Sequence, residues 1–75
     1  MKSSERFELR AAGPSNTTII DHKSRRAILL TPNAALAESI HARLITLNDS
    51  ATDGLTAKQV KAIVAEALNP IKEGN

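Results

Sequence analysis

The fold class follows from residues 17–30, which read TTIIDHKSRRAILL. Two short runs of β-branched and aliphatic residues, 17–20 and 27–30, flank the charged segment 21–26. Runs that suit a pleated, half-buried surface and are separated by polar residues are typical of a β-hairpin. The sequence therefore predicts a hairpin with its turn near residues 22–25. The turn contains no Asn-Gly or Asp-Gly pair, so its register stays open.

A further strand is predicted upstream of this hairpin. In residues 6–12, Phe7, Leu9 and Ala11 alternate with Glu8 and Arg10, the period of a strand with one buried face. The segment 12–16 then supplies a glycine and a proline, which favour a turn. Residues 6–30 are therefore expected to form a small antiparallel sheet of about three strands.

An amphipathic helix is predicted downstream, over residues 32–48. Thr31 can cap such a helix, and Pro32 suits its first position, where the missing amide hydrogen is not needed. The expected apolar stripe, which would pack on the sheet, consists of Leu36, Ala37, Ile40, Leu44 and Leu47.

A second helix is predicted over residues 56–69. Thr56 and Gln59 have the spacing of a capping box, and Leu55 and Val60 have the spacing of a hydrophobic staple. Pro70 cannot continue the helix. The expected fold is α+β, a single domain over residues 1–75, with residues 1–5 and 71–75 frayed.

Composition argues against several classes of function. The chain has no cysteine, its three glycines are isolated, and its carboxylates form no recognisable acid-base pair. His22 and His41 have no second ligand at helical spacing and are expected to be solvated. We therefore expect no enzyme activity, no metal, no cofactor and no small-molecule substrate. With neither a signal-like nor a membrane-spanning apolar run, the expected location is the cytoplasm.

The order of elements from Phe7 to Asn48 resembles short open reading frames of phages and prophages. The matching pieces are Ile19-Ile20-Asp21, Arg26-Ala27-Ile28-Leu29, Ala37, Ile40 and Leu47-Asn48. The chain departs from that pattern in lacking the glycine usual in the hairpin turn. The resemblance implies an accessory factor that binds a host or phage macromolecule, and it assigns no functional residues.

Two kinds of partner remain open. The first is a protein, including a second copy of the chain, bound through the basic hairpin tip and the second helix; the candidate residues are Lys23, Arg25, Arg26, Val60 and Val64. The second is duplex nucleic acid bound by the basic hairpin, which Arg6 and Arg10 would assist from a solvent-facing strand. Base stacking on single strands is disfavoured because Phe7 is the only aromatic residue.

Overall fold

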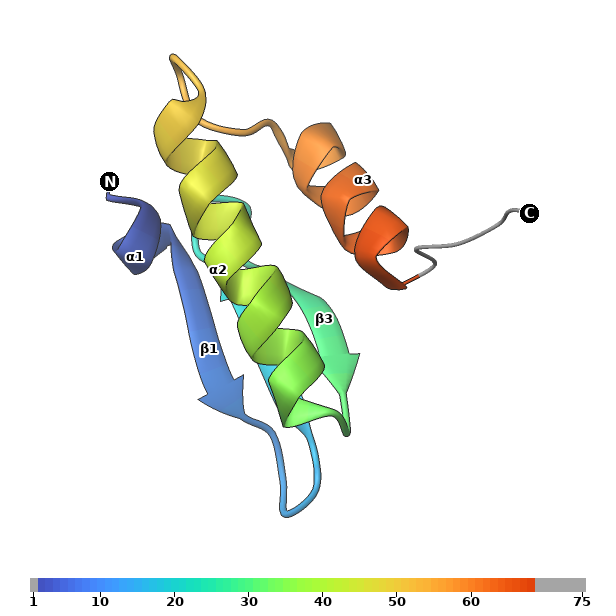
Figure 1. The fold of residues 1–75 in the computed structure, drawn as a ribbon. Helices are drawn as coiled ribbons and strands as arrows, with labels where there is room; N and C mark the ends of the chain where they lie inside the picture. Colours follow the sequence, from blue (N-terminus) through green and yellow to red (C-terminus); the bar gives the residue numbers. More distant parts are fainter. Residues whose placement is uncertain (1, 69–75) are drawn as a thin grey trace, which may run out of the picture.

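The computed structural model describes residues 2–68. Its elements are α1 (Ser3–Arg6), β1 (Phe7–Ala11), β2 (Thr17–Asp21), β3 (Arg26–Thr31), α2 (Ala34–Ser50) and α3 (Ala57–Leu68) (Figure 1). The three strands form one antiparallel sheet in the order β1-β2-β3. The predicted α+β class, with a long helix on a small sheet and a second helix after it, is confirmed.

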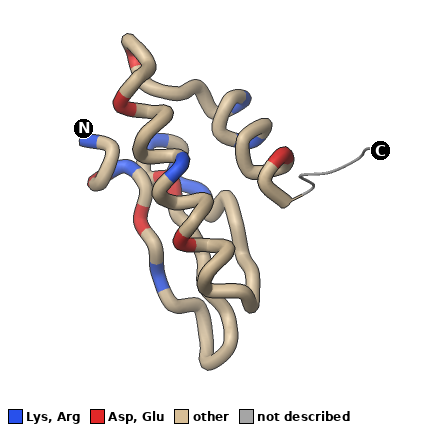
Figure 2. Tube along the Cα trace, in the orientation of Figure 1, with Lys and Arg blue, Asp and Glu red and all other residues tan. Residues whose placement is uncertain are grey.

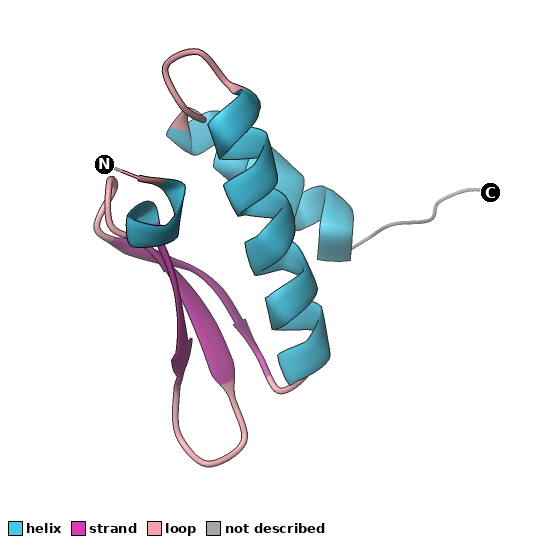
Figure 3. Cartoon of the chain, turned by 60° about the vertical axis from the view of Figure 1, so that its left-hand side comes forward, coloured by secondary structure: helices cyan, strands magenta, loops and turns pink. Residues whose placement is uncertain are grey.

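The sheet and α2 make two layers. Figure 3 shows α2 lying along one face of the sheet, while no described helix covers the opposite face. In the register of the sheet, Ile19 on the central strand lies between Leu9 of β1 and Leu29 of β3. A bulge follows, because Ile20 pairs with Ala27 and leaves Ile28 without a partner on β2.

The hairpin turn lies at residues 22–25, as predicted. Arg25 takes a positive φ of 60°, the conformation that glycine adopts most readily. The carboxylate of Asp21 accepts a hydrogen bond from the Lys23 amide at 3.0 Å. This side-chain bond closes the turn locally, so the hairpin forms without the expected glycine.

The core lies between the sheet and the two longer helices. Its most buried members are Phe7, Ile19, Leu29, Ala37, Ile40, Leu44, Leu55, Val60 and Val64. The predicted stripe of α2 is confirmed, since Ala37, Ile40 and Leu44 are buried and Leu36 and Leu47 pack against them.

The start of α2 differs from the prediction. Thr31 is the last residue of β3, and the N-cap is Asn33, whose side chain accepts from the Leu36 amide at 3.0 Å. The Thr31 hydroxyl instead accepts from the Asn33 amide at 3.1 Å. The prediction was wrong because Thr31 is needed in the ladder opposite Thr17. Pro32 therefore lies in the turn that links β3 to α2.

The predicted start of α3 is confirmed. The Thr56 amide donates to Gln59 Oε1 at 2.9 Å, and the Gln59 amide donates to Thr56 Oγ1 at 3.1 Å. Leu55 and Val60 are both buried in the core, as the staple requires. The described part of α3 ends at Leu68, so the predicted last residue, Asn69, lies outside the described residues.

The N-terminal segment differs from the expectation of fraying. Residues 3–6 form α1, and both Ser3 and Arg6 are buried. The segment expected to fray at the other end, 71–75, lies outside the described residues. Over residues 2–68, no helix has both the length and the apolar composition that crossing a membrane requires.

Candidate functional site

One buried ion pair joins the end of α1 to the end of β2. Arg6 is 3% exposed and Asp21 is 1% exposed. The Arg6 Nε and Nη2 atoms donate to the two oxygens of the Asp21 carboxylate, at 2.9 and 3.0 Å. The strand register brings them together, because Phe7 lies opposite Asp21. This is the two-pronged geometry in which arginine binds a carboxylate most strongly.

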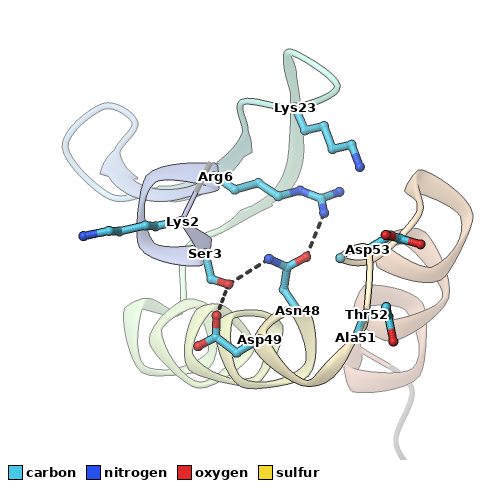
Figure 4. Close-up of a pocket in the computed structure, with 10 residues that line it drawn as sticks. Lys2, Ser3, Arg6, Lys23, Asn48, Asp49, Ala51, Thr52 and Asp53 are labelled. Atoms are coloured by element: carbon cyan, nitrogen blue, oxygen red, sulfur yellow. Dashed lines mark hydrogen bonds between the residues drawn. The ribbon is translucent and has the colours of Figure 1, made fainter.

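The remaining arginine nitrogen reaches the helical layer. Arg6 Nη1 donates to Asn48 Oδ1 at 2.9 Å and to the Leu55 carbonyl oxygen at 2.7 Å. Asn48 also donates to Ser3 Oγ at 2.7 Å and accepts from the Leu55 amide at 2.8 Å. Figure 4 shows Arg6, Ser3 and Asn48 converging from α1 and α2. We call Ser3, Arg6, Asp21, Asn48 and Leu55 the polar cluster.

Gly54 lets the loop between α2 and α3 approach the polar cluster. Its φ is +78°, and a Cβ atom at this position would lie 3.0 Å from Asn48 Oδ1. That oxygen is held by two hydrogen bonds, so it cannot move aside freely. Glycine is therefore required here for both its backbone conformation and its lack of a side chain.

A cavity of about 450 Å³ borders the polar cluster, with Lys23 and Asp53 in its lining. The polar atoms beneath it are already bonded to one another, and Ser3 also donates to Asp49. Among the described residues, every buried side-chain nitrogen and oxygen has a partner, and no three His, Asp or Glu residues could hold a metal ion. The cluster therefore joins the elements of the fold and offers no unpaired group for chemistry.

The electrostatics of the cluster predict a loss of stability in acid. Burial alone would raise the pKa of Asp21, but hydrogen bonds from the Arg6 side chain and the Lys23 amide, with the charge of Arg6, hold this pKa below its usual value of 3.8. A depressed native pKa stabilises the fold above the unfolded pKa, and this contribution is lost as the pH falls through the native pKa. We therefore expect the urea midpoint of the chain to fall as the pH is lowered below about 4.

The matched control for this pH dependence is Glu8→Gln. The pKa of Glu8 is also lowered, by its hydrogen bonds with Arg10 and His22, but that carboxylate lies at the surface. Asp21→Asn should flatten the acid-induced fall much more than Glu8→Gln does. Equal acid profiles for wild type and Asp21→Asn would contradict the assignment.

A larger groove lies between α3 and β3. Its volume is about 840 Å³, within the usual size range of ligand-binding clefts. The apolar part of its lining consists of Ala27, Ile28, Ala57, Val60, Val64, Ala65 and Leu68. Leu68 lines the groove and is 45% exposed. We call this feature the α3–β3 groove.

The rim of the α3–β3 groove is basic. Lys58 and Lys61 lie one turn apart on α3, and Arg26 begins β3 on the opposite wall. None of these three cations forms an ion pair with any residue in 2–68. Asp21 is the one acidic side chain among the described residues that line the groove, and it is already bound to Arg6. Figure 2 shows the basic positions of α3 gathered toward its start.

The structure brings part of the predicted partner-binding set together. Arg26, Val60 and Val64 line the α3–β3 groove. Lys23 borders the other cavity, and Arg25 lines neither. Val60 is 1% exposed and Val64 is 6% exposed, so both belong mainly to the core and contribute only the floor of the groove. The second helix thus packs on the domain instead of presenting its whole apolar stripe.

The expectation that Arg6 faces solvent is wrong, because Arg6 is buried against Asp21. Arg10 is exposed, as expected, but it is occupied by a two-pronged contact with Glu8 at 2.9 Å. His41 is also not simply solvated, since its Nε2 donates to the Phe7 carbonyl oxygen at 2.8 Å. The basic stripe across neighbouring strands that duplex binding would have used is therefore missing.

Sequence reasoning missed Lys58, Lys61 and Leu68 as groove residues and Arg6 as the centre of the polar cluster. The spacing of three between Lys58 and Lys61 places them side by side on the polar face of a helix, which by itself indicates only a solvated surface. No local signal relates them to Arg26, because that proximity depends on how α3 packs on the sheet.

Comparison with known proteins gave no relative. No protein-family model, curated protein or solved structure matches the chain. The resemblance to phage and prophage reading frames therefore stays a prediction.

Proposed function

We propose that this chain is a non-catalytic accessory module that binds another protein in the α3–β3 groove. One observation carries the proposal: the groove combines an apolar lining with cations on both walls that pair with no described carboxylate. Interfaces of specific complexes typically have an apolar centre and a polar rim. The resemblance to phage and prophage reading frames is the ground for proposing a host or phage protein, and the cytoplasm, as its setting.

A non-catalytic role is supported by how the buried polar groups are used. Arg6, Asp21 and Asn48 hold α1, β2 and α2 together, and their hydrogen bonds are directed at one another. A catalytic nucleophile or general base needs a neighbouring group that activates it, and it must lie within hydrogen-bond reach of a substrate. The groove offers lysines and aliphatic side chains, which suit recognition.

A protein partner is favoured over nucleic acid by the same surface. Nucleic-acid affinity depends mainly on cations that contact phosphates along an exposed face. Here Arg6 is buried, Arg10 is bound to Glu8, and the centre of the groove is aliphatic. Burial of an aliphatic surface is most favourable in free energy when it removes apolar side chains of a protein partner from water as well.

The test compares two exposed leucines. Leu68 lines the groove and is 45% exposed, whereas Leu30 is 64% exposed on β3 and does not line it. Tagged wild type, Leu68→Gln and Leu30→Gln are used to capture protein from a lysate of the source organism, one half of which is treated with nuclease and the other half left untreated. We expect a stoichiometric protein with wild type and Leu30→Gln, reduced at least about tenfold with Leu68→Gln.

Two results would contradict the proposed function. One is equal recovery of the partner by Leu68→Gln and by wild type, when circular dichroism shows that both proteins are folded. The other is capture that disappears after nuclease treatment, which would assign the basic hairpin to nucleic acid.

A further inference from the structure

We infer that the occupant of the α3–β3 groove is an acidic amphipathic helix of the partner protein. The inference rests on the proposed function and adds the chemistry of the segment that is bound. It is carried by the charge of the rim, by the form of β3 and by the position of Leu68.

The charge of the rim selects an acidic segment. Arg26, Lys58 and Lys61 stand on the two walls without a carboxylate partner among residues 2–68. The first turn of α3 contains no acidic residue, so the positive end of its helix dipole adds to the same field. An acidic ligand would pair with these cations, whereas a basic one would be repelled at both walls.

The form of β3 selects a helix over an added strand. A strand that extends a sheet needs a regular row of free backbone groups along the edge. The bulge at Ile28 interrupts that row in the middle of β3, and α3 lies alongside the same strand. A helix needs no backbone partners from the groove and can direct apolar side chains at one-turn intervals onto Val64, Leu68 and Ile28.

A second copy of this chain fits the groove less well. Among residues 2–68, its exposed carboxylates on helices are Glu5, Glu38, Asp49 and Glu66, and they are spread over α1, α2 and α3. Glu66 is moreover paired with Arg43 at 3.2 Å. The apolar stripe of α2 is already used against the sheet. No described helix of the chain thus presents a free apolar stripe with acidic flanks.

The experiment measures binding of three labelled helical peptides to the full chain by fluorescence anisotropy. Each peptide has about five turns. The first has leucines on one face and glutamates on the others, the second has lysines in place of the glutamates, and the third has the composition of the first in a scrambled order. We expect the first peptide to bind at least about tenfold more tightly than the other two, with affinity falling as salt rises.

Two double variants with the same change in net charge test the rim. Lys58→Glu with Lys61→Glu should reverse the preference between the acidic and basic peptides. Arg10→Glu with Arg43→Glu alters exposed positions outside the groove and should leave the preference unchanged. Leu68→Gln should weaken the acidic peptide about tenfold, while Leu30→Gln should not.

Several outcomes would overturn the inference. Equal binding of the first and third peptides would mean that helical amphipathicity is not recognised. Equal binding of acidic and basic peptides would remove the role of the rim. A dimer in sedimentation that Leu68→Gln abolishes would identify a second copy as the occupant. Tighter binding of a duplex DNA probe than of the acidic peptide, lost in Lys58→Glu with Lys61→Glu, would assign the groove to nucleic acid.

The two proposals fail in distinguishable ways. Loss of the captured protein in Leu68→Gln without any preference for the acidic peptide would keep the groove as the binding site and overturn only the chemistry of its partner. Retention of the captured protein by Leu68→Gln would remove the groove itself.

Discussion

Replacing Arg6 by methionine should lower the free energy of unfolding by about 3–5 kcal/mol, the usual effect of removing one partner from a buried ion pair. Methionine keeps the unbranched stem of arginine but donates no hydrogen bonds. The carboxylate of Asp21, a residue that is 1% exposed, would keep its hydrogen bond from the Lys23 amide but would have no opposite charge beside it. Asn48 and the Leu55 carbonyl would lose the same donor.

This effect is large relative to the stability of a small domain. A chain of 75 residues is stabilised by roughly 4–11 kcal/mol in total. The Arg6→Met variant should therefore show a much lower urea midpoint by circular dichroism, or fail to fold. Arg10→Met is the matched control, because Arg10 pairs with Glu8 at the surface, where such a pair contributes less than about 1 kcal/mol.

A double variant separates the charge from the packing. Arg6→Met with Asp21→Leu leaves no unpaired charge in the interior, and replacing a whole buried pair by apolar residues is often nearly neutral. The double variant should thus be more stable than Arg6→Met alone. If it is less stable, or if Arg6→Met differs from wild type by less than about 1 kcal/mol, the polar cluster does not stabilise the fold as described.

The hairpin and the two long helices could be predicted because their signals are local. The alternation from Phe7 to Ala11 and the capping box at Thr56 and Gln59 each specify a structure within a few residues. The start of α2 was mispredicted because two capping residues, Thr31 and Asn33, stand close together. Only the ladder between Thr31 and Thr17 decides between them.

The polar cluster and the groove could not be predicted in this way because they are assembled from distant segments. Arg6 and Asp21 each look like ordinary surface residues in the sequence. Their contact follows from the register that places Phe7 opposite Asp21. The groove depends on the packing of α3 beside β3, so neither Lys61 nor Arg26 alone indicates it.

Phe7→Ala should lower the free energy of unfolding by about 3–5 kcal/mol, because truncating a buried aromatic side chain leaves a cavity that the surrounding core fills only in part. Phe7 is the only aromatic residue of the chain and is fully buried beside Ile19, Ile40 and Leu44 in the core. The Arg6 guanidinium also lies 4.7 Å from the centre of its ring.

Because the Phe7 ring also contacts the Arg6 guanidinium, the stability lost on replacing Phe7 should depend on whether Arg6 is present. A cation held against a desolvated aromatic face gains up to about 2 kcal/mol, so the ring supports the arginine as well as filling the core. Phe7→Leu, which keeps most of the apolar volume, should cost roughly 1–1.5 kcal/mol by urea denaturation. Leu30→Ala, at an exposed site, should change stability by less than about 0.5 kcal/mol.

Double variants test whether the ring and the arginine act together. Because Phe7 and Arg6 are in contact, the loss of stability in Phe7→Leu with Arg6→Met should differ from the sum of the two single losses. The loss in Leu30→Ala with Arg6→Met should equal the sum of its two single losses. Additive losses for Phe7 and Arg6 would mean that the ring supports the fold through packing alone.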